Sequence, residues 1–419
     1  MEWSVVKQYR SLFRNRNFLL LWAGSAISSV GDFFNSIALV KVLSADPAHL
    51  GLWMALVMIA KVVPGVILGP VAGVVADRFP RRTVMIITDV LRAGLVAGLV
   101  FTSAPSAIIT LCTLAAVVST FHGPAYNALL PTVVTPEELV SANSLSVVTG
   151  RLAMLLGNGL GAVVMIFLGA HNVFYIDAAS FLVSGALLLP MVPPAAAALA
   201  RTDGSEHRSM AARFGADLKE ALTFIRQTPT IRNMMITLAI VAFPDASLNV
   251  LMTTFFTIDL GLPAEGLGLL WALMGGTAVV GALVIGAIGS RVHWKYLISA
   301  GAVYIWACMV ALLLIRGVIS SATFIGLIGL GSGAINVGIQ AAIGLLVPDQ
   351  IRGRIFGGWG MINNLIYVIG ALASGWLSDW MGASTTLMGF VTFYLLAGVY
   401  AWFAFRAEGS RRPSEAVTA

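Results

Sequence analysis

Four ionisable side chains fall near the middle of long apolar stretches, where charge is costly. They are Asp32, Lys61, Arg92 and Asp245. A charge at the centre of a bilayer costs at least ~2.5–3.5 kcal/mol on insertion scales, so such residues usually pair with one another or do chemistry. A carboxylate at that depth can bind and release a proton, or attract a cationic solute. We therefore predict that Asp32 and Asp245 are proton-coupling or substrate-binding residues.

Basic partners for these acids can be proposed from their order along the chain. Lys61 lies in the apolar stretch after Asp32, and consecutive helices often pack together, so we expect these two to pair. Arg151 is a second candidate cation. A pair that breaks in one conformation would link protonation to movement, whereas a permanent pair would be structural. Asp89 and Arg92 share a helix face, and we expect a local structural pair there.

Neutral polar side chains in the same stretches can hydrogen-bond a ligand, or one another across helix interfaces. The candidates for lining a cavity are Asn35, His122, Tyr126, Asn127, Asn249, Asn336 and Gln340. A lone histidine such as His122 is more often a packing residue. Asp177, near the end of its stretch, is expected to be structural.

One spacing recurs among these residues and indicates an internal repeat. Asp245 follows Asp32 by 213 positions, and Gln340 follows Asn127 by the same number. A basic loop segment repeats at that offset too, with Gly286, Arg291 and Lys295 in the places of Gly73, Arg78 and Arg82. The repeat predicts two equivalent halves facing one another, an arrangement typical of transporters. It is incomplete, because Met274 stands where Lys61 would recur.

The composition requires lipid around these stretches. Hydrophobic residues make up 58% of the 419 residues and charged residues only 11%, against roughly 45–50% and about 25% in soluble domains. A membrane-spanning helix needs about 20 apolar residues. Twelve such stretches can be placed, which predicts an all-α membrane protein with 12 transmembrane helices; they lie near 18–42, 50–76, 83–103, 106–131, 143–168, 173–191, 231–258, 266–289, 296–315, 318–347, 356–379 and 384–405.

The net charge of +6 is explained by topology rather than by nucleic acid. Twenty of the 25 Lys and Arg fall on one predicted membrane side, the positive-inside pattern, so we expect both termini in the cytoplasm. The first stretch is too long for a cleaved signal peptide. Cys112 and Cys308 lie in apolar stretches, where packing is a better explanation than a disulfide or a metal site. We expect no cofactor and no metal.

The predicted halves are residues 1–191 and 231–419, the second ending in a short cytoplasmic tail. The segment 192–230 between them changes to a mixed-charge composition, and Ala212 to Arg226 could form an amphipathic helix on the membrane surface. Thr135-Pro136-Glu137-Glu138 is typical of a helix start, with an N-cap, a first-turn proline and acids that complement the dipole. Pro348-Asp349-Gln350 predicts a similar start in the second half.

The loop after the second stretch carries the most specific motif. Gly73, Asp77, Arg78, Arg81 and Arg82 match the loop signature of the major facilitator superfamily, with Pro80 where glycine is usual. The chain resembles that superfamily over essentially its whole length. Within it, the chain resembles the bacterial drug:proton antiporters that include macrolide-efflux proteins and the enterobactin exporter; the segments behind this are Leu12–Phe18, Thr88–Ala93, Gly123–Ala125, Ala128–Pro131, Pro136–Leu139 and Ala142-Asn143.

The resemblance implies a fold whose helices 1, 4, 7 and 10 line a central cavity. It also implies that the Gly73–Arg82 motif is a cytoplasmic gate that stabilises the outward-open state, with Asp77 meeting the positive N-terminus of helix 11 near Ile355. The alternative is that its arginines only fix the topology. Antiporters of the superfamily often carry Gly-Pro-x-x-Gly-Gly in helix 5. This chain has Gly157-Asn158-Gly159-Leu160-Gly161-Ala162, without the proline, but the glycines still predict close helix packing.

These observations favour a secondary transporter, because the chain has no phosphate-binding Gly-x-x-x-x-Gly-Lys-Ser/Thr segment. We expect a monomer in a bacterial cytoplasmic membrane that exports amphipathic or apolar small molecules, drug or siderophore-like, against proton entry. An importer or a lipid flippase on the same fold is the alternative. An intramembrane aspartyl enzyme is disfavoured, because Ser29 interrupts the Gly-x-Gly-Asp pattern at Asp32. We expect protons, lipids and the substrate as partners, and no nucleic acid.

Overall fold

The computed structural model describes residues 10–192, 223, 225–288, 292–347 and 349–406, except for the side chains of residues 140, 343–344, 349–358 and 360–361. Its elements are helices throughout, and the described residues contain no strand. The long helices are α2 (Arg16–Leu43), α3 (Leu50–Arg78), α4 (Arg81–Gly98), α5 (Pro105–Val133), α6 (Leu139–Leu188), α8 (Pro229–Thr254), α9 (Ala264–Ile288), α10 (Trp294–Leu314), α11 (Val318–Leu346), α12 (Asp349–Met381) and α13 (Ala383–Ala404).

These helices confirm the twelve predicted stretches, to within a few residues at most ends. The fifth and sixth stretches both lie in α6, which is interrupted at Gly169. Its φ of 78° and ψ of 164° are open to glycine and strained for other residues, so the chain can turn there between two membrane crossings. Short turns η1 (Pro47–His49), η2 (Leu99–Phe101) and η4 (Phe255–Asp259) complete the described elements.

Length and hydropathy alone mark ten of the described helices as candidate membrane spans. This count treats α6 as one span and does not include α12, whose first residues have side chains outside those described. Dividing α6 at Gly169 and adding α12 gives twelve. The chain is therefore a multi-pass membrane protein of the predicted all-α class.

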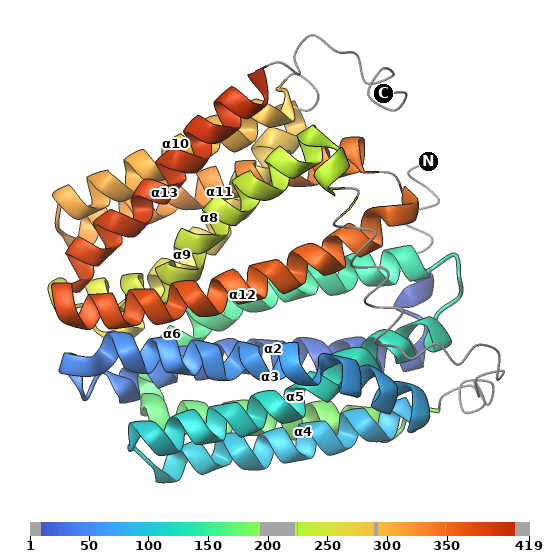
Figure 1. Cartoon of the computed structure of the whole chain (residues 1–419). Coiled ribbons are helices and arrows are strands. Elements are labelled where there is room, and N and C mark those ends of the chain that lie inside the picture. The colour runs from blue at the N-terminus through green and yellow to red at the C-terminus, as the bar shows by residue number, and fades with distance from the viewer. Residues whose placement is uncertain (1–9, 193–222, 224, 289–291, 348, 407–419) are drawn as a thin grey trace. The chain divides into compact units, whose positions relative to one another are not determined.

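The contacts divide the chain into two compact units, each of which we describe by itself. Unit 1 contains residues 1–47, 56–207 and 263–272; unit 2 contains residues 48–55, 208–262 and 273–419. In unit 1, α2 packs along α6, and α4 packs on α5 and α6 (Figure 1). In unit 2, α8 packs on α12 and α13, and α10 packs on α11 and α13. The predicted linker 192–230, with its amphipathic helix, lies largely outside the described residues, so that boundary stays a prediction.

The glycines of α6 bring it into close contact with α2. A Cβ added at Gly157 would lie 2.5 Å from Cβ of Phe33, and one at Gly161 would lie 3.1 Å from the ring of Phe34. A larger residue at either position would push the helices apart. The predicted packing role of these glycines is confirmed.

Polar side chains tie the helix ends of unit 1 together at the end where the chain enters α2. Asn15 caps α2 by accepting a bond from N–H of Phe18 (3.1 Å), and its amide donates to the Val133 carbonyl at the end of α5 (2.5 Å). The side chain of Asn17 exchanges two hydrogen bonds with the backbone of Val192. The Leu12–Phe18 segment, which supported the family resemblance, thus ties the start of α2 to the end of α5 and to Val192 after α6.

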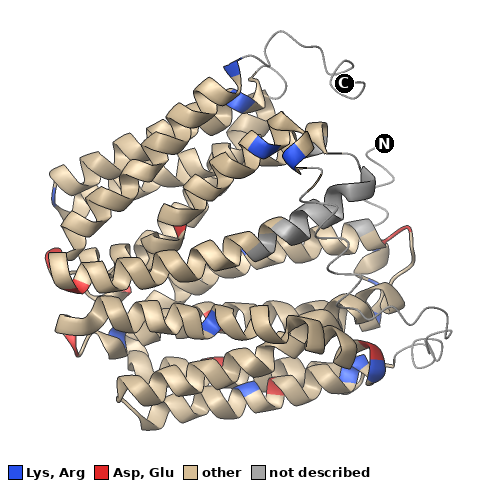
Figure 2. Cartoon of the chain, viewed as in Figure 1, with Lys and Arg blue, Asp and Glu red and all other residues tan. Residues whose placement is uncertain are grey.

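The predicted helix start at Thr135–Glu138 falls on the turn just before α6, which begins at Leu139 with Glu138, and not Thr135, as its N-cap residue. Backbone N–H of Thr135 donates to the Glu138 carboxylate (3.2 Å), as in a capping box. Bonds from its own backbone N–H and from the Thr135 side chain lower the pKa of Glu137, which keeps this exposed acid charged at the helix start. In the second half, α12 begins at Asp349 as predicted. Figure 2 shows that most Lys, Arg, Asp and Glu lie near helix ends, with a few inside the helices.

Candidate functional site

The polar centre of unit 1 is built on the buried face of α4. Met85, Thr88, Asp89, Arg92 and Ala93 are buried, a spacing of three and four residues that traces one side of a helix. Val90 and Leu91 are exposed on the other side. The middle of the helix therefore turns Asp89 and Arg92 inward and Val90 and Leu91 outward, as expected where lipid is the solvent.

Arg92 of α4 pairs with Asp32 of α2. Nη2 of Arg92 donates to both carboxylate oxygens of Asp32, at 3.0 and 2.9 Å. The guanidinium also lies 3.9 Å from the ring centroid of Phe181, a cation–π contact. The Arg92 side chain is only 8% exposed, whereas that of Asp32 is 53% exposed. The cation is thus held in the protein while its acid partner remains accessible.

This ion pair lines a cavity of about 430 Å³ inside unit 1. Residues of α2, α3, α4 and α5 form most of the wall, with Phe181 of α6. The polar part of the wall comes from Asp32, Asn35, Ser36, Lys61 and Arg92, together with Ser119 and Thr120; the apolar part comes from Phe33, Leu95, Val96, Leu99 and Leu111. The volume lies in the range of small-molecule sites, and one polar patch in an apolar wall suits an amphipathic guest.

The expected pairing of Asp32 with Lys61 is wrong in this structure. Lys61 is exposed, and its Nζ donates to Oγ of Ser36 (3.2 Å), whereas Arg92 takes Asp32. Helix α3, which follows α2 in the chain, places Lys61 in the wall of the same cavity. The cation that contacts the Asp32 carboxylate is Arg92 of α4. The second expected cation, Arg151, is exposed on α6 and makes no ion pair with any acid in the described part of the chain.

Sequence reasoning missed the role of Arg92, which it treated as half of a local pair. That local pair exists, at 3.9 Å between Nη1 of Arg92 and Oδ1 of Asp89. However, the shorter contact of Arg92 is the one with Asp32, which lies on a different helix, α2. The missed signal was the spacing of polar residues on α4, since Thr88, Asp89 and Arg92 lie on the face opposite Val90 and Leu91.

A second layer of polar groups lies behind the cavity wall. Nε2 of His122 lies 3.6 Å from Oδ1 of Asp89, too far for a good hydrogen bond. Asn35 donates to the carboxylate of fully buried Asp177 at 2.7 Å. Oγ of Ser180 lies 3.5 Å from that carboxylate's other oxygen. Asp177 thus contacts Asn35 of the cavity wall, and His122 lies beside Asp89, the second acid near Arg92.

The other predicted cavity residues of unit 1 do not line this cavity. The hydroxyls of Tyr126 and Ser146 bond at 2.8 Å between α5 and α6, and Asn127 is exposed. Sequence position placed Asn35 correctly, since it lines the cavity one helical turn after Asp32.

In unit 2, the surroundings of Asp245 differ from those of Asp32 in unit 1. Asp245 is exposed and accepts a hydrogen bond from the hydroxyl of buried Tyr394 on α13. Asn249, one turn later on α8, donates to the Tyr367 hydroxyl (3.2 Å). On α11, Asn336 and Gln340 are exposed, and Asn336 donates to the Ser332 carbonyl (2.9 Å). Among the described residues, the partner of Asp245 is this neutral hydroxyl and not a cation.

The Gly73–Arg82 motif anchors the ends of three helices within unit 1. Arg81 donates to the Ala128 carbonyl of α5 (2.9 Å), and Nε of Arg82 donates to the Leu188 carbonyl at the end of α6 (2.7 Å). Asp77 and Arg78 end α3 and are exposed. The predicted contact of Asp77 with the helix near Ile355 falls on side chains outside those described, so the gate stays a prediction.

The remaining chemistry of the described residues is limited. Cys112 and Cys308 are free and buried, as their apolar surroundings predicted. No group of three or more His, Cys, Asp or Glu side chains in the described part is placed to hold a metal ion. The site therefore offers ion pairing, hydrogen bonding and proton exchange.

Comparison with known proteins identifies the family. The model of the Major Facilitator Superfamily matches residues 21–328 and 320–418, nearly the whole chain. The chain belongs to the major facilitator superfamily. It is a membrane transporter and not an enzyme, which rules out the intramembrane aspartyl enzyme. The resemblance inferred from the Gly73–Arg82 motif is confirmed.

Relatives within the superfamily include efflux proteins. The chain is 28% identical to the MFS-type transporter YfiS of Bacillus subtilis over 417 residues, which covers 96% of this chain and 97% of that one. It is 22% identical to macrolide efflux protein A of Streptococcus pyogenes, with 88% and 90% covered. It is 26% identical to the multidrug efflux pump Tap of Mycolicibacterium fortuitum, with 83% and 86% covered.

Solved structures share the fold at low identity. A bacterial homologue of the human lysosomal transporter Spinster superposes with a TM-score of 0.72 at 13% identity, covering 93% of this chain and 97% of that one. A bacterial homologue of the iron transporter ferroportin gives 0.71 at 18% identity, with 96% and 100% covered. Both support the twelve-helix facilitator fold.

Proposed function

We propose that this major facilitator protein exports amphipathic or apolar small molecules, drug or siderophore-like, across a bacterial cytoplasmic membrane in exchange for protons. The observation that carries the proposal is the Asp32–Arg92 pair in the wall of the unit 1 cavity. The efflux relatives support the direction of transport. Expected partners are the substrate, protons and membrane lipids, and we expect a monomer with both termini in the cytoplasm.

The balance of charges around the cavity supports proton coupling. Three carboxyl groups lie in or behind the cavity wall, those of Asp32, Asp89 and Asp177, whereas the cations there are Arg92 and Lys61. Surplus charge in a low-dielectric surrounding is costly. Binding one proton to a carboxyl group makes this set neutral while His122 is neutral, so gain and loss of a proton are chemically accessible there.

The exposed acid is the natural entry point for that proton. Asp32 faces the cavity, whereas Asp89 and Asp177 are fully buried. A proton on Asp32 weakens its hold on Arg92, which changes the charge that a guest meets in the cavity. A guest bound beside Asp32 and a proton on Asp32 would then compete, which is the requirement for exchange transport.

Everted membrane vesicles with an imposed pH gradient provide the test. The parent should accumulate a fluorescent amphipathic dye when the vesicle lumen is acidic, and Asp32→Asn should reduce this gradient-driven accumulation at least tenfold at equal expression. Glu137→Gln is the matched control, because it removes an exposed acid outside the spans. Full accumulation by Asp32→Asn would refute the coupling role.

The same vesicles separate the alternatives. An importer would concentrate the dye with the gradient reversed, and a flippase would move a fluorescent phospholipid between leaflets without accumulating a soluble dye. Either result would overturn the export proposal while leaving membership of the superfamily intact.

A further inference from the structure

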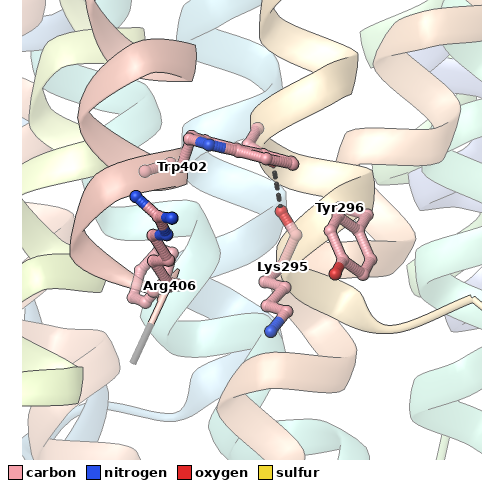
Figure 3. A pocket seen from close by; sticks show the side chains of 7 residues that line it. Lys295, Tyr296, Trp402 and Arg406 are labelled. Atoms are coloured by element: carbon pink, nitrogen blue, oxygen red, sulfur yellow. Dashed lines mark hydrogen bonds between the residues drawn. The ribbon is translucent and has the colours of Figure 1, made fainter. Parts of the chain in front are cut away.

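A small pocket lies at one end of α10 and α13 in unit 2, away from Asp245. Its volume is about 60 Å³, room for one small polar group and not for a whole lipid or drug. Lys295, Tyr296 and Ser299 come from α10; Ala401, Trp402, Phe405 and Arg406 come from the end of α13. Figure 3 shows Lys295 and Arg406 below the ring of Trp402, with Tyr296 to the right of Lys295.

Among the described residues, the pocket wall has two positive charges and no acid. Neither Lys295 nor Arg406 forms an ion pair with any acid in the residues that the structure describes. Lys295 is half-buried, and its Nζ lies 5.2 Å from the ring centroid of Tyr296. Two cations held at one hollow without a counter-charge favour an anionic ligand.

The first turn of α10 adds to the positive character of the pocket. Nδ1 of His293 accepts the N–H of Lys295 (3.4 Å). Burial, and then the charge of Lys295, lower the pKa of His293, so the imidazole is neutral at neutral pH and can accept this bond. The positive end of the helix dipole lies at the same turn as Lys295.

The rim and floor of the pocket have the character of a membrane interface. Trp402 and Tyr296 are 52% and 45% exposed, and their ring centroids are 5.9 Å apart. The floor is rigid, because buried Phe405 packs edge-on against Trp294 at 4.9 Å. Tryptophan and tyrosine are enriched where membrane helices meet the lipid headgroups. The ligand should therefore combine an anion with acyl chains that stay outside the hollow.

We propose that this pocket binds the phosphate group of an anionic phospholipid, such as phosphatidylglycerol. Lys295 and Arg406 pair with the phosphate, while the acyl chains run along the exposed faces of Trp402 and its neighbour Phe403. By the positive-inside expectation this end faces the cytoplasm, so the lipid comes from the inner leaflet. The site is independent of the proposed export mechanism.

The test compares lipids on the purified full-length protein. Thermal stability in detergent is titrated with phosphatidylglycerol, with zwitterionic phosphatidylcholine and with inorganic phosphate, and bound lipid is counted by native mass spectrometry. A cation near an anionic surface contributes ~1 kcal/mol, so the double variant Lys295→Gln/Arg406→Gln should bind phosphatidylglycerol roughly 25-fold more weakly. Trp402→Leu should weaken binding with both charges retained.

The control is Arg226→Gln/Arg232→Gln, which removes two exposed positive charges near the start of α8. That segment packs with Trp294 and Phe405 in one apolar cluster, so the charges lie at the same end of unit 2 but outside the pocket. The control should bind as the parent does. Equal weakening in both double variants would show a general charge effect and overturn the site. Protection by inorganic phosphate alone would overturn the lipid as ligand.

Single variants keep the test decisive if the double variant misfolds. Lys295→Gln and Arg406→Gln should each weaken phosphatidylglycerol binding about fivefold. Unchanged binding in both would refute the proposal.

Discussion

Arg92 and Asp32 form one ion pair but have unequal roles, because their exposures differ so strongly. The Asp32 carboxylate can be hydrated when its partner is removed, whereas the Arg92 guanidinium is enclosed by Phe181, Asp89 and the helix interface. Breaking a buried pair by removing one partner is destabilising because the other charge stays behind uncompensated. Arg92 therefore holds the cluster together, whereas Asp32 is the member that is accessible from the cavity.

Arg92→Gln should accordingly destabilise the protein more than Asp32→Asn. The first change leaves fully buried Asp89 without the cation 3.9 Å away and should cost about 3 kcal/mol or more. The second should cost about 1 kcal/mol, and Lys61→Gln, which removes an exposed bond to Ser36, should cost less. Thermal unfolding of the purified variants measures the order. An equal loss for Arg92→Gln and Lys61→Gln would contradict it.

Tyr394 offers a residue-level test of Asp245. Its buried hydroxyl donates to the Asp245 carboxylate, so Tyr394→Phe removes a bond that favours the charged acid. If Asp245 exchanges protons during transport, the acid side of the transport pH profile should move to higher pH. Tyr400→Phe is the matched control, since it removes a hydroxyl bond to Asn233 from the same helix. If the transport pH profile of Tyr394→Phe is the same as that of Tyr400→Phe, Asp245 has a structural role.

At the scale of single elements, hydrophobic length predicted the helices well and their partners poorly. The apolar stretches predicted every long helix, including the two that meet at Gly169. Sequence order then suggested that Lys61, on the neighbouring helix, would pair with Asp32. The choice depends on which face of each helix turns inward, and on how far a side chain reaches across an interface. Arg92 lies on the buried face of α4, whereas Lys61 is exposed.

The basic Gly73–Arg82 loop also contacts the end of α6, a structural role that its charge alone did not predict. Arg82 donates to the carbonyls of Leu188 and Leu189 at the end of α6, where the Leu188 carbonyl also accepts the N–H of Met191 (3.2 Å). Arg82→Gln should cost about 1–2 kcal/mol and accelerate amide exchange around the end of α6. Arg78→Gln, which changes an exposed arginine of the same loop, should have little effect on that exchange. Equal protection in both variants would refute this capping role.

At the scale of the whole molecule, the 213-residue repeat predicts that Asp32 and Asp245 correspond, which stays a prediction, and the two acids have different surroundings. Asp32 pairs with Arg92, and Asp245 with the hydroxyl of Tyr394. The position of Lys61 is taken by Met274 in the repeat, so the asymmetry was partly visible in the sequence. The neutral partner was not, because Tyr394 lies 149 residues from Asp245 and only the packing of α13 on α8 brings them together.

The last prediction concerns the conformational balance of the transporter. Arg81 and Arg82 bond to backbone carbonyls within unit 1. Asp77 is exposed and takes part in neither of these two contacts. The family resemblance implies that this exposed acid attracts the positive N-terminus of α12, and we keep that contact as a prediction. Asp77→Asn should then favour the inward-open state.

A single cysteine at exposed Gln340, with Cys112 and Cys308 replaced, reports this change by its labelling rate from the cytoplasmic side. We expect severalfold faster labelling in Asp77→Asn and the parental rate in Glu137→Gln, which removes a negative charge from the same end of unit 1. Because a local electrostatic change would affect both variants alike, only a selective response supports the gate. Identical labelling of Asp77→Asn and the parent would leave Asp77 as a marker of topology.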